Sequence, residues 1–318
     1  MNKIISFCIV SLTLSFCAVS IQAQNPISPA GVYIADPTGR IGMDGKMYIY
    51  GSLDDKTSDY CSTLYHVISS PDLLDWTLHK NTFSSKGEGD EVPYSDLPMA
   101  APDMLYRNGI YHLYYDLADG TEGVAISEKP EGPFRNGVLI DGAMGIDPTV
   151  FIDDDGQAYY YWGQFSAKGA KMNPDMKTID KSSIVDGIVT EQEHFFHEGG
   201  FIFKRNGFYY FIYTDISRQD RATCIGYAMS KSPLGPYEYK GVIIDNAGCD
   251  PEVWNNHGSV VEYKGQWYVL YHRSTHHSKS MRKACIEPIT FRPDGTIPEV
   301  QMTSQGAGKP LDAFQQID

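Results

Sequence analysis

Hydrophobic and aromatic residues along the chain fall into short runs separated by turn residues. No stretch combines helical periodicity with capping residues, whereas runs such as 149–152 and 158–161 are rich in β-branched or aromatic side chains. These two runs flank the acidic turn 153–156, which is typical of a β-hairpin. The pattern therefore predicts strands throughout and an all-β fold.

One unit of this pattern occurs five times, as a polar residue, a strand, a glycine turn and an aromatic strand. The turn glycines are Gly45, Gly109, Gly156, Gly207 and Gly265. Six to nine residues before them stand Asp36, Asp103, Asp147, Glu198 and His257. Repeats of about 40–50 residues built from aromatic hairpins are typical of propeller blades. We therefore expect a five-bladed β-propeller, since the alternative of an all-β sandwich does not explain this fivefold order.

A second repeat supports the blades. Residues 125–134 resemble residues 228–237, with the shared pattern Ser-x-x-Pro-x-Gly-Pro, and residues 69–76 are a variant of it. Each copy follows an aromatic hairpin, where the outer strands of a blade are expected. We interpret this motif as a structural turn without chemistry.

The N-terminus reads as a secretory signal. Lys3 is the only charge before an apolar run at 4–19, which is short for a membrane span. Cleavage after Ala23 is expected, so 1–23 is a predicted signal peptide and 24–318 a single propeller domain. Cys17 follows the bulky Phe16, which makes a poor lipoprotein site. We expect a secreted bacterial protein, periplasmic or extracellular, with no integral membrane segment after signal removal.

The net charge and the cysteine spacing argue against two classes of site, a nucleic-acid surface and a zinc site. Without the predicted signal peptide, 25 Lys and Arg residues stand against 40 Asp and Glu residues. This acidic balance argues against nucleic acid and suits a neutral polymer. The cysteines of the mature part lack paired CxxC spacing, which argues against zinc. Their disulfide pairing stays open, although mostly free, buried thiols are expected; they are Cys61, Cys224, Cys249 and Cys285.

Three acids at equivalent blade positions are the candidates for catalysis. An Asp-Pro pair alone is a common turn signal. In a propeller, however, Asp36, Asp147 and Glu198 would face one axis and converge. Such a set suits glycoside hydrolysis, in which an ionised carboxylate activates water and a protonated one donates to the leaving oxygen. A third acid nearby raises the proton affinity of the donor.

Other polar residues are expected near the same axis. His257 would ligate a metal through water or hydrogen-bond a carboxylate. Arg273 would bind sugar hydroxyls or influence the ionisation of the acid, with a surface ion pair as the alternative. Asp103 would bind a hydroxyl or anchor a blade.

At these residues the chain resembles glycoside hydrolase family 43, five-bladed propellers that attack arabinose- and xylose-containing polysaccharides. The resemblance implies that Asp36 is the general base, Glu198 the general acid and Asp147 the residue that tunes and orients the acid, in an inverting mechanism without a covalent intermediate. It also implies no cofactor for the chemistry and a structural calcium near His257, mostly through water. The matching stretches are 35–37, 101–103, 147–156, 198–199 and 257–261.

The chain departs from the family pattern at two places. Gly199-Gly200 follows the acid where Gly-Pro is frequent, and Met99-Ala100 stands where many members carry a Trp. Trp76 and Trp162 are therefore candidates for the sugar platform, with core packing as the alternative for both.

The expected activity is an exo-acting α-L-arabinofuranosidase on plant cell-wall polysaccharide or oligosaccharide. The alternatives are a β-D-xylosidase and an endo-1,4-β-xylanase or arabinanase. Polar loops at 54–60 and 80–94 are expected to wall the site, which favours exo action. A non-catalytic carbohydrate-binding propeller would not need all three acids, and a structural or protein-interaction propeller would need none.

Overall fold

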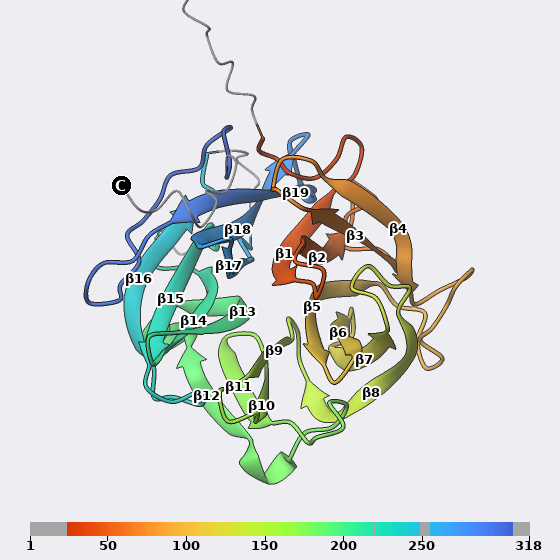
Figure 1. Ribbon diagram of the computed structural model, residues 1–318, viewed down its shortest axis with the longest axis horizontal. Helices are drawn as coiled ribbons and strands as arrows, with labels where there is room; N and C mark the ends of the chain where they lie inside the picture. The colour runs from red at the N-terminus through yellow and green to blue at the C-terminus, as the bar shows by residue number, and fades with distance from the viewer. Residues whose placement is uncertain (1–23, 219–220, 249–254, 308–318) are drawn as a thin grey trace, which may run out of the picture.

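The computed structural model describes residues 24–218, 221–248 and 255–307. The predicted signal peptide, Cys17 and Cys249 lie outside this part of the chain. Five antiparallel sheets surround a common axis, and the first strand of each blade lies innermost (Figure 1). This confirms the predicted five-bladed β-propeller.

In the part of the chain that the structure describes, four blades have four strands each and the fifth has three. Blade 1 consists of β1 (Ile34–Ile41), β2 (Met47–Leu53), β3 (Leu64–Ser70) and β4 (Thr77–Ser84). Blade 2 consists of β5 (Met99–Arg107), β6 (Ile110–Leu117), β7 (Thr121–Ser127) and β8 (Arg135–Met144). Blade 3 consists of β9 (Thr149–Ile152), β10 (Ala158–Trp162), β11 (Ser166–Lys171) and β12 (Val185–Thr190).

Blade 4 consists of β13 (Phe196–Arg205), β14 (Phe208–Asp215), β15 (Cys224–Ser230) and β16 (Glu238–Asp245). Blade 5 consists of β17 (Ser259–Tyr263), β18 (Gln266–Thr275) and β19 (Ser278–Ile289). The helical elements of the described residues are a 3-10 turn, η1 (Lys181–Ser183), and one helical turn, α1 (Glu191–His194).

The predicted glycine turns join the first and second strands of each blade. Asn108-Gly109 and Asn206-Gly207 have positive φ angles at both positions (52° and 88°, 50° and 74°). A two-residue turn with positive φ at both positions matches the right-handed twist of the two strands that it joins. Asn and Gly tolerate this conformation best. The Ser-x-x-Pro-x-Gly-Pro repeat lies between the third and fourth strands of blades 2 and 4, which confirms its interpretation as a turn.

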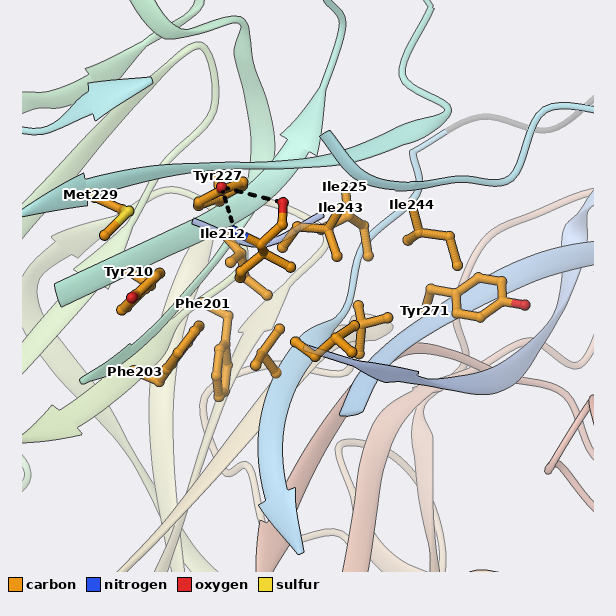
Figure 2. Close-up of a cluster of buried hydrophobic side chains, with 14 of the residues drawn as sticks. Phe201, Phe203, Tyr210, Ile212, Ile225, Tyr227, Met229, Ile243, Ile244 and Tyr271 are labelled. Atoms are coloured by element: carbon orange, nitrogen blue, oxygen red, sulfur yellow. Dashed lines mark hydrogen bonds between the residues drawn. The ribbon is translucent and has the colours of Figure 1, made fainter. Parts of the chain in front are cut away.

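Five apolar layers lie between neighbouring blades and hold the ring together. Strand β10 contributes to two of them, because successive side chains point to opposite faces. Tyr160 and Trp162 pack toward blade 2, and Tyr159 and Tyr161 pack toward blade 4. Figure 2 shows the layer between blades 4 and 5, where Tyr227 hydrogen-bonds the backbone of Ile297.

The N-terminal residues close the ring against the last strand. Asn25 exchanges two hydrogen bonds of 2.9 Å with the backbone of Ile286, and the Ile27 N–H donates to the Ala284 carbonyl at 2.8 Å. These contacts tie residues 25–27, which lead into β1, to β19, so that blades 1 and 5 are held side by side.

Within the described ranges, no helix is long and apolar enough to cross a membrane. Cys61 and Cys224 are free thiols, in agreement with the expectation for these two residues.

Candidate active site

Asp36 and Glu198 lie at irregular places in the inner strands β1 and β13, and Asp147 lies just before the inner strand β9. The β1–β2 register shifts between Ala35 and Thr38, and the β13–β14 register shifts on both sides of Glu198. Asp36 and Asp147 adopt left-handed backbone conformations, with φ of 51° and 58°. Because bulges re-aim side chains, the inner strands present these carboxyl groups at the axis instead of in a blade face.

The base side of the site is organised around Asp36, which is only 5% exposed. Ser52 Oγ donates to its Oδ2 at 2.6 Å, and Arg282 Nη1 donates to its Oδ1 at 2.9 Å. Burial alone would raise the pKa of Asp36, but the Arg282 guanidinium, with His272 and His257, holds this pKa below its usual range. Asp36 is therefore an ionised carboxylate at neutral pH.

Arg282 is itself held by a second carboxylate. Its Nε and Nη2 donate to the two oxygens of Asp54 at 2.8 and 2.9 Å, a bidentate pair. The guanidinium carbon lies 4.7 Å from the centre of the Tyr60 ring, whose hydroxyl has no hydrogen-bond partner among the described residues. Sequence reasoning missed Arg282, because only the β18–β19 pairing brings it to Asp36.

The acid side contains Asp147 and Glu198. Asp147 Oδ2 accepts the Gly199 N–H at 2.8 Å, which links the two acids. Burial raises the pKa of Asp147, and the charges of Glu198 and other carboxyls raise it further. Burial likewise raises the pKa of Glu198, although His197 and the amide of Gln164, 2.8 Å from Oε2, oppose the change.

His257 lies between the two sides. Its Nδ1 is 3.8 Å from Asp36 Oδ1 and 3.9 Å from Asp147 Oδ1, and burial lowers its pKa. A side chain on Gly199 would place a Cβ 2.8 Å from the imidazole, so glycine after the acid leaves room for this ring. In the described ranges no group of three or more His, Cys, Asp or Glu side chains is placed to hold a metal. The residues present thus form no direct ligand set, and calcium held through water stays a prediction.

Asp103 occupies a different position from the other acids. The residue of blade 2 that corresponds to Asp36, with positive φ before a proline, is Ala101 (φ 37°). The Asp103 carboxylate, 1% exposed, is fully used by protein donors: Arg40 at 2.8 and 2.6 Å, Thr149 Oγ1 at 2.9 Å and the Val150 N–H at 2.9 Å. These donors come from blades 1 and 3. The structure therefore supports the blade-anchor alternative over sugar binding.

The arginine near the base is not Arg273. In β18 the His272 ring points to Asp36, with Nδ1 3.1 Å from the Asp36 nitrogen. Successive side chains of a strand point to opposite faces, so the neighbouring Arg273 points away from this contact. Arg282 takes the place expected for Arg273.

Neither tryptophan is placed as a platform. Trp162 is 3% exposed in the layer between blades 2 and 3, and Trp76 packs in the layer between blades 5 and 1. An aromatic ring that does lie beside the acid is Phe165, which follows Gln164 and is 51% exposed. The backbone N–H of Phe165 donates to the His197 carbonyl at 2.7 Å, and the Phe165 and His197 rings meet edge to face with their centroids 5.1 Å apart.

Of the two loops expected to wall the site, 54–60 and 80–94, only the first lies beside it. Loop 54–60 borders the base side, because Tyr60 covers Arg282 and the Thr57 carbonyl accepts from Ser278 Oγ at 3.2 Å. In loop 80–94, Glu91 pairs with Arg135 of the outer strand β8 at 2.6 Å. That loop lies against the outside of blade 2, which corrects the expectation that it walls the site.

Comparison with known proteins agrees with this geometry. The sequence model of glycosyl hydrolases family 43 matches residues 23–297. A xylosidase/arabinosidase of Thermoclostridium stercorarium is 32% identical, over 91% of this chain and 69% of its own length. A beta-xylosidase of Xylanibacter ruminicola is 30% identical, over 76% of this chain and 87% of its own length.

Solved structures extend the likeness to the fold. A family 43 beta-xylosidase/alpha-arabinofuranosidase from a compost microbial metagenome, in complex with xylotriose, superimposes with a TM-score of 0.74. It is 27% identical and covers 86% of this chain and 96% of its own. With the family model spanning most of the chain, this protein belongs to glycosyl hydrolase family 43 and is an O-glycosyl hydrolase.

Proposed function

We propose that this enzyme is an inverting, exo-acting glycosidase that releases a terminal pentose, with α-L-arabinofuranosidase as the first activity and β-D-xylosidase as the alternative. One observation carries the mechanism: two carboxyl groups of one buried site have opposite pKa shifts, lowered for Asp36 and raised for Glu198. A general base has to be ionised and a general acid protonated at the same pH.

In the proposed reaction, Asp36 takes a proton from a water molecule while the water oxygen attacks the anomeric carbon. The bond from that carbon to the glycosidic oxygen breaks, and Glu198 gives its proton to this oxygen as it leaves. The configuration inverts because water attacks the face opposite the leaving group. Water then restores the proton of Glu198 and accepts that of Asp36.

Asp147 influences the acid Glu198 through a hydrogen bond to the neighbouring Gly199 and through repulsion between the two carboxyl groups. Its carboxyl group accepts from the backbone of Gly199, next to the acid, and repulsion between the two carboxyl groups raises the pKa of Asp147. We assign Asp147 to tuning and orienting the acid, and no proton transfer to the substrate.

The pentose assignment rests on the relatives, whose names cover both xylosidase and arabinosidase activity. Phe165 supports an oligosaccharide substrate. Its exposed ring stands beside Gln164, which holds the acid, and the leaving sugar departs on the acid side. An apolar ring at this place offers a face for stacking on a sugar.

The deciding experiment is a parallel assay of p-nitrophenyl α-L-arabinofuranoside and β-D-xyloside, with Asp36→Ala beside the wild type, because an aryl leaving group bypasses the acid but not the base. Release from one substrate, lost in the variant, identifies the sugar and the enzyme class together. No release from either contradicts the pentosidase proposal and directs a screen to polysaccharides for an endo-acting enzyme. On linear arabinan, an exo enzyme yields monosaccharide first, and early oligomers of mixed length contradict exo action.

A further inference from the structure

A second pair of carboxyl groups lies behind the acid side of the site. Asp116 on β6 and Glu122 on β7 are directly opposite each other in the strand pairing, on the face that packs against blade 3. Side chains in this relation have Cβ atoms about 4.5–5.5 Å apart. They are 2% and 1% exposed. Two buried acids this close are costly without a use.

Asp116 contacts the catalytic region directly. Its Oδ1 accepts the backbone N–H of Asp147 at 3.3 Å. Asp147 is a non-glycine residue with φ of 58°, a strained conformation that persists where the surroundings hold it. Two hydrogen bonds fix Asp147: its backbone N–H donates to Asp116, and its side-chain carboxyl group accepts from the Gly199 N–H.

Glu122 is incompletely paired by its neighbours. Tyr160 donates its hydroxyl to Oε2, and Oε1 has no hydrogen-bond partner among the described residues. The charged and titratable groups near the pair are Asp147, Asp36, Tyr65, Tyr160 and Lys168. Lys168 also faces Asp186, at 3.9 Å. Burial and mutual repulsion raise the pKa of both carboxyls.

We propose that Asp116 and Glu122 are positioning residues for the acid half of the reaction. Asp116 holds the backbone of Asp147, and the negative charge that remains when the pair shares one proton disfavours ionisation of Asp147 and loss of the catalytic proton from Glu198. This proposal rests on the roles proposed above for those two acids.

Substitutions separate the two contributions. Asp116→Asn keeps an oxygen that accepts the Asp147 N–H, whereas Asp116→Ala removes it. We expect kcat to fall about tenfold or more in the Ala variant, because misplacement of a catalytic group is costly, and to stay within about threefold in the Asn variant. Equal kcat values for the two variants contradict the hydrogen-bond part of the proposal.

The charge is tested by the double variant Asp116→Asn, Glu122→Gln, through the pH profile of kcat/KM. When neither residue can ionise, Glu198 loses its proton more readily, and the alkaline limb moves to lower pH by about 0.5–1 unit. A merely structural role lowers the melting temperature and leaves the limb in place, so an unchanged limb overturns the proposal. If the double variant does not fold, each single variant is held to the same criterion, with a smaller shift expected.

Asp215→Asn is the matched control. Asp215 is a buried acid with an unpartnered oxygen among the described residues, at the corresponding end of the second strand of blade 4, and its other oxygen accepts from Ser217. It should change stability without moving the limb. A wild type inactive on all glycosides would mean failure of the proposed function, whereas an active wild type with unchanged variant profiles means failure of this inference alone.

Discussion

The carboxyl groups on the base side and on the acid side of the site are buried to nearly the same extent, but their pKa values are shifted in opposite directions. Asp36 and Glu198 are 5% and 8% exposed. Asp36 faces a guanidinium that is held in place by Asp54, whereas Glu198 has the His197 imidazole, a neutral amide and the Asp36 carboxyl near it. Burial raises both pKa values, so the difference between the two sides comes from the groups that favour the ionised form of Asp36, of which Arg282 contributes most. A buried acid becomes a base or a proton donor according to its neighbours.

The largest effect is expected from removing either catalytic carboxyl. Asp36→Ala and Glu198→Ala should each lower kcat/KM on natural glycosides by about 10³-fold or more, since general acid–base groups contribute about 10²–10⁴-fold each. An aryl glycoside with a good leaving group needs little protonation, so it should restore much of the rate in Glu198→Ala only. Near-normal activity in Asp36→Ala would refute its assignment as the base.

Arg282→Met should remove the difference in charge between the two sides. Asp36 must be ionised to act, and its lowered pKa keeps it so at acidic pH. Without the cation this pKa rises, and the acidic limb of kcat/KM moves to higher pH by about one unit or more. Asp36 also contributes stability above its unfolded-state pKa, which is lost as the pH falls through its folded-state pKa.

The same variant should unfold more easily by about 3–5 kcal/mol at neutral pH, because it leaves buried charge unpaired. The double variant Arg282→Met, Asp54→Asn, measured by urea denaturation, should recover part of this stability while the acidic limb stays displaced. Recovery of the limb as well would show that Asp54, and not Arg282, controls the base.

The Asp103 carboxylate lies on neither the base side nor the acid side of the site, since it anchors neighbouring blades. Asp103→Ala should lower stability by about 3 kcal/mol, because Arg40 and the Val150 N–H lose their acceptor. Thermal unfolding should show a melting temperature about 5–10 °C lower. At low temperature kcat/KM should stay within about threefold of wild type. A large activity loss in the folded variant would return Asp103 to the substrate site.

The smallest effect is expected at Gln164, and its sign is opposite to that of the carboxyl pair. Its amide stabilises the ionised form of Glu198, so Gln164→Ala should raise the pKa of the acid. The alkaline limb of kcat/KM then moves to higher pH by about 0.5 unit. Gln164→Glu serves as the contrasting variant, with a larger shift in the same direction. A shift to lower pH would contradict the hydrogen bond as the cause.

The sequence alone was sufficient for the blades and for bringing Asp36, Asp147 and Glu198 to one axis, although not for the place of Asp103. Turn glycines, aromatic strands and the residues before them repeat along the chain, and turn geometry depends on neighbouring residues. The five glycine turns and the five-bladed ring were predicted correctly from this local information.

Only the tertiary structure decided which groups surround each acid. Arg282 reaches Asp36 from 246 residues away, and Asp116 reaches Asp147 across the boundary between two blades. The same applies to Asp103, whose donors come from two other blades, and to the tryptophans, whose burial depends on the packing of adjacent sheets. No local pattern marks such contacts, because ring closure and strand register set them. A carboxyl group takes its pKa from those neighbours.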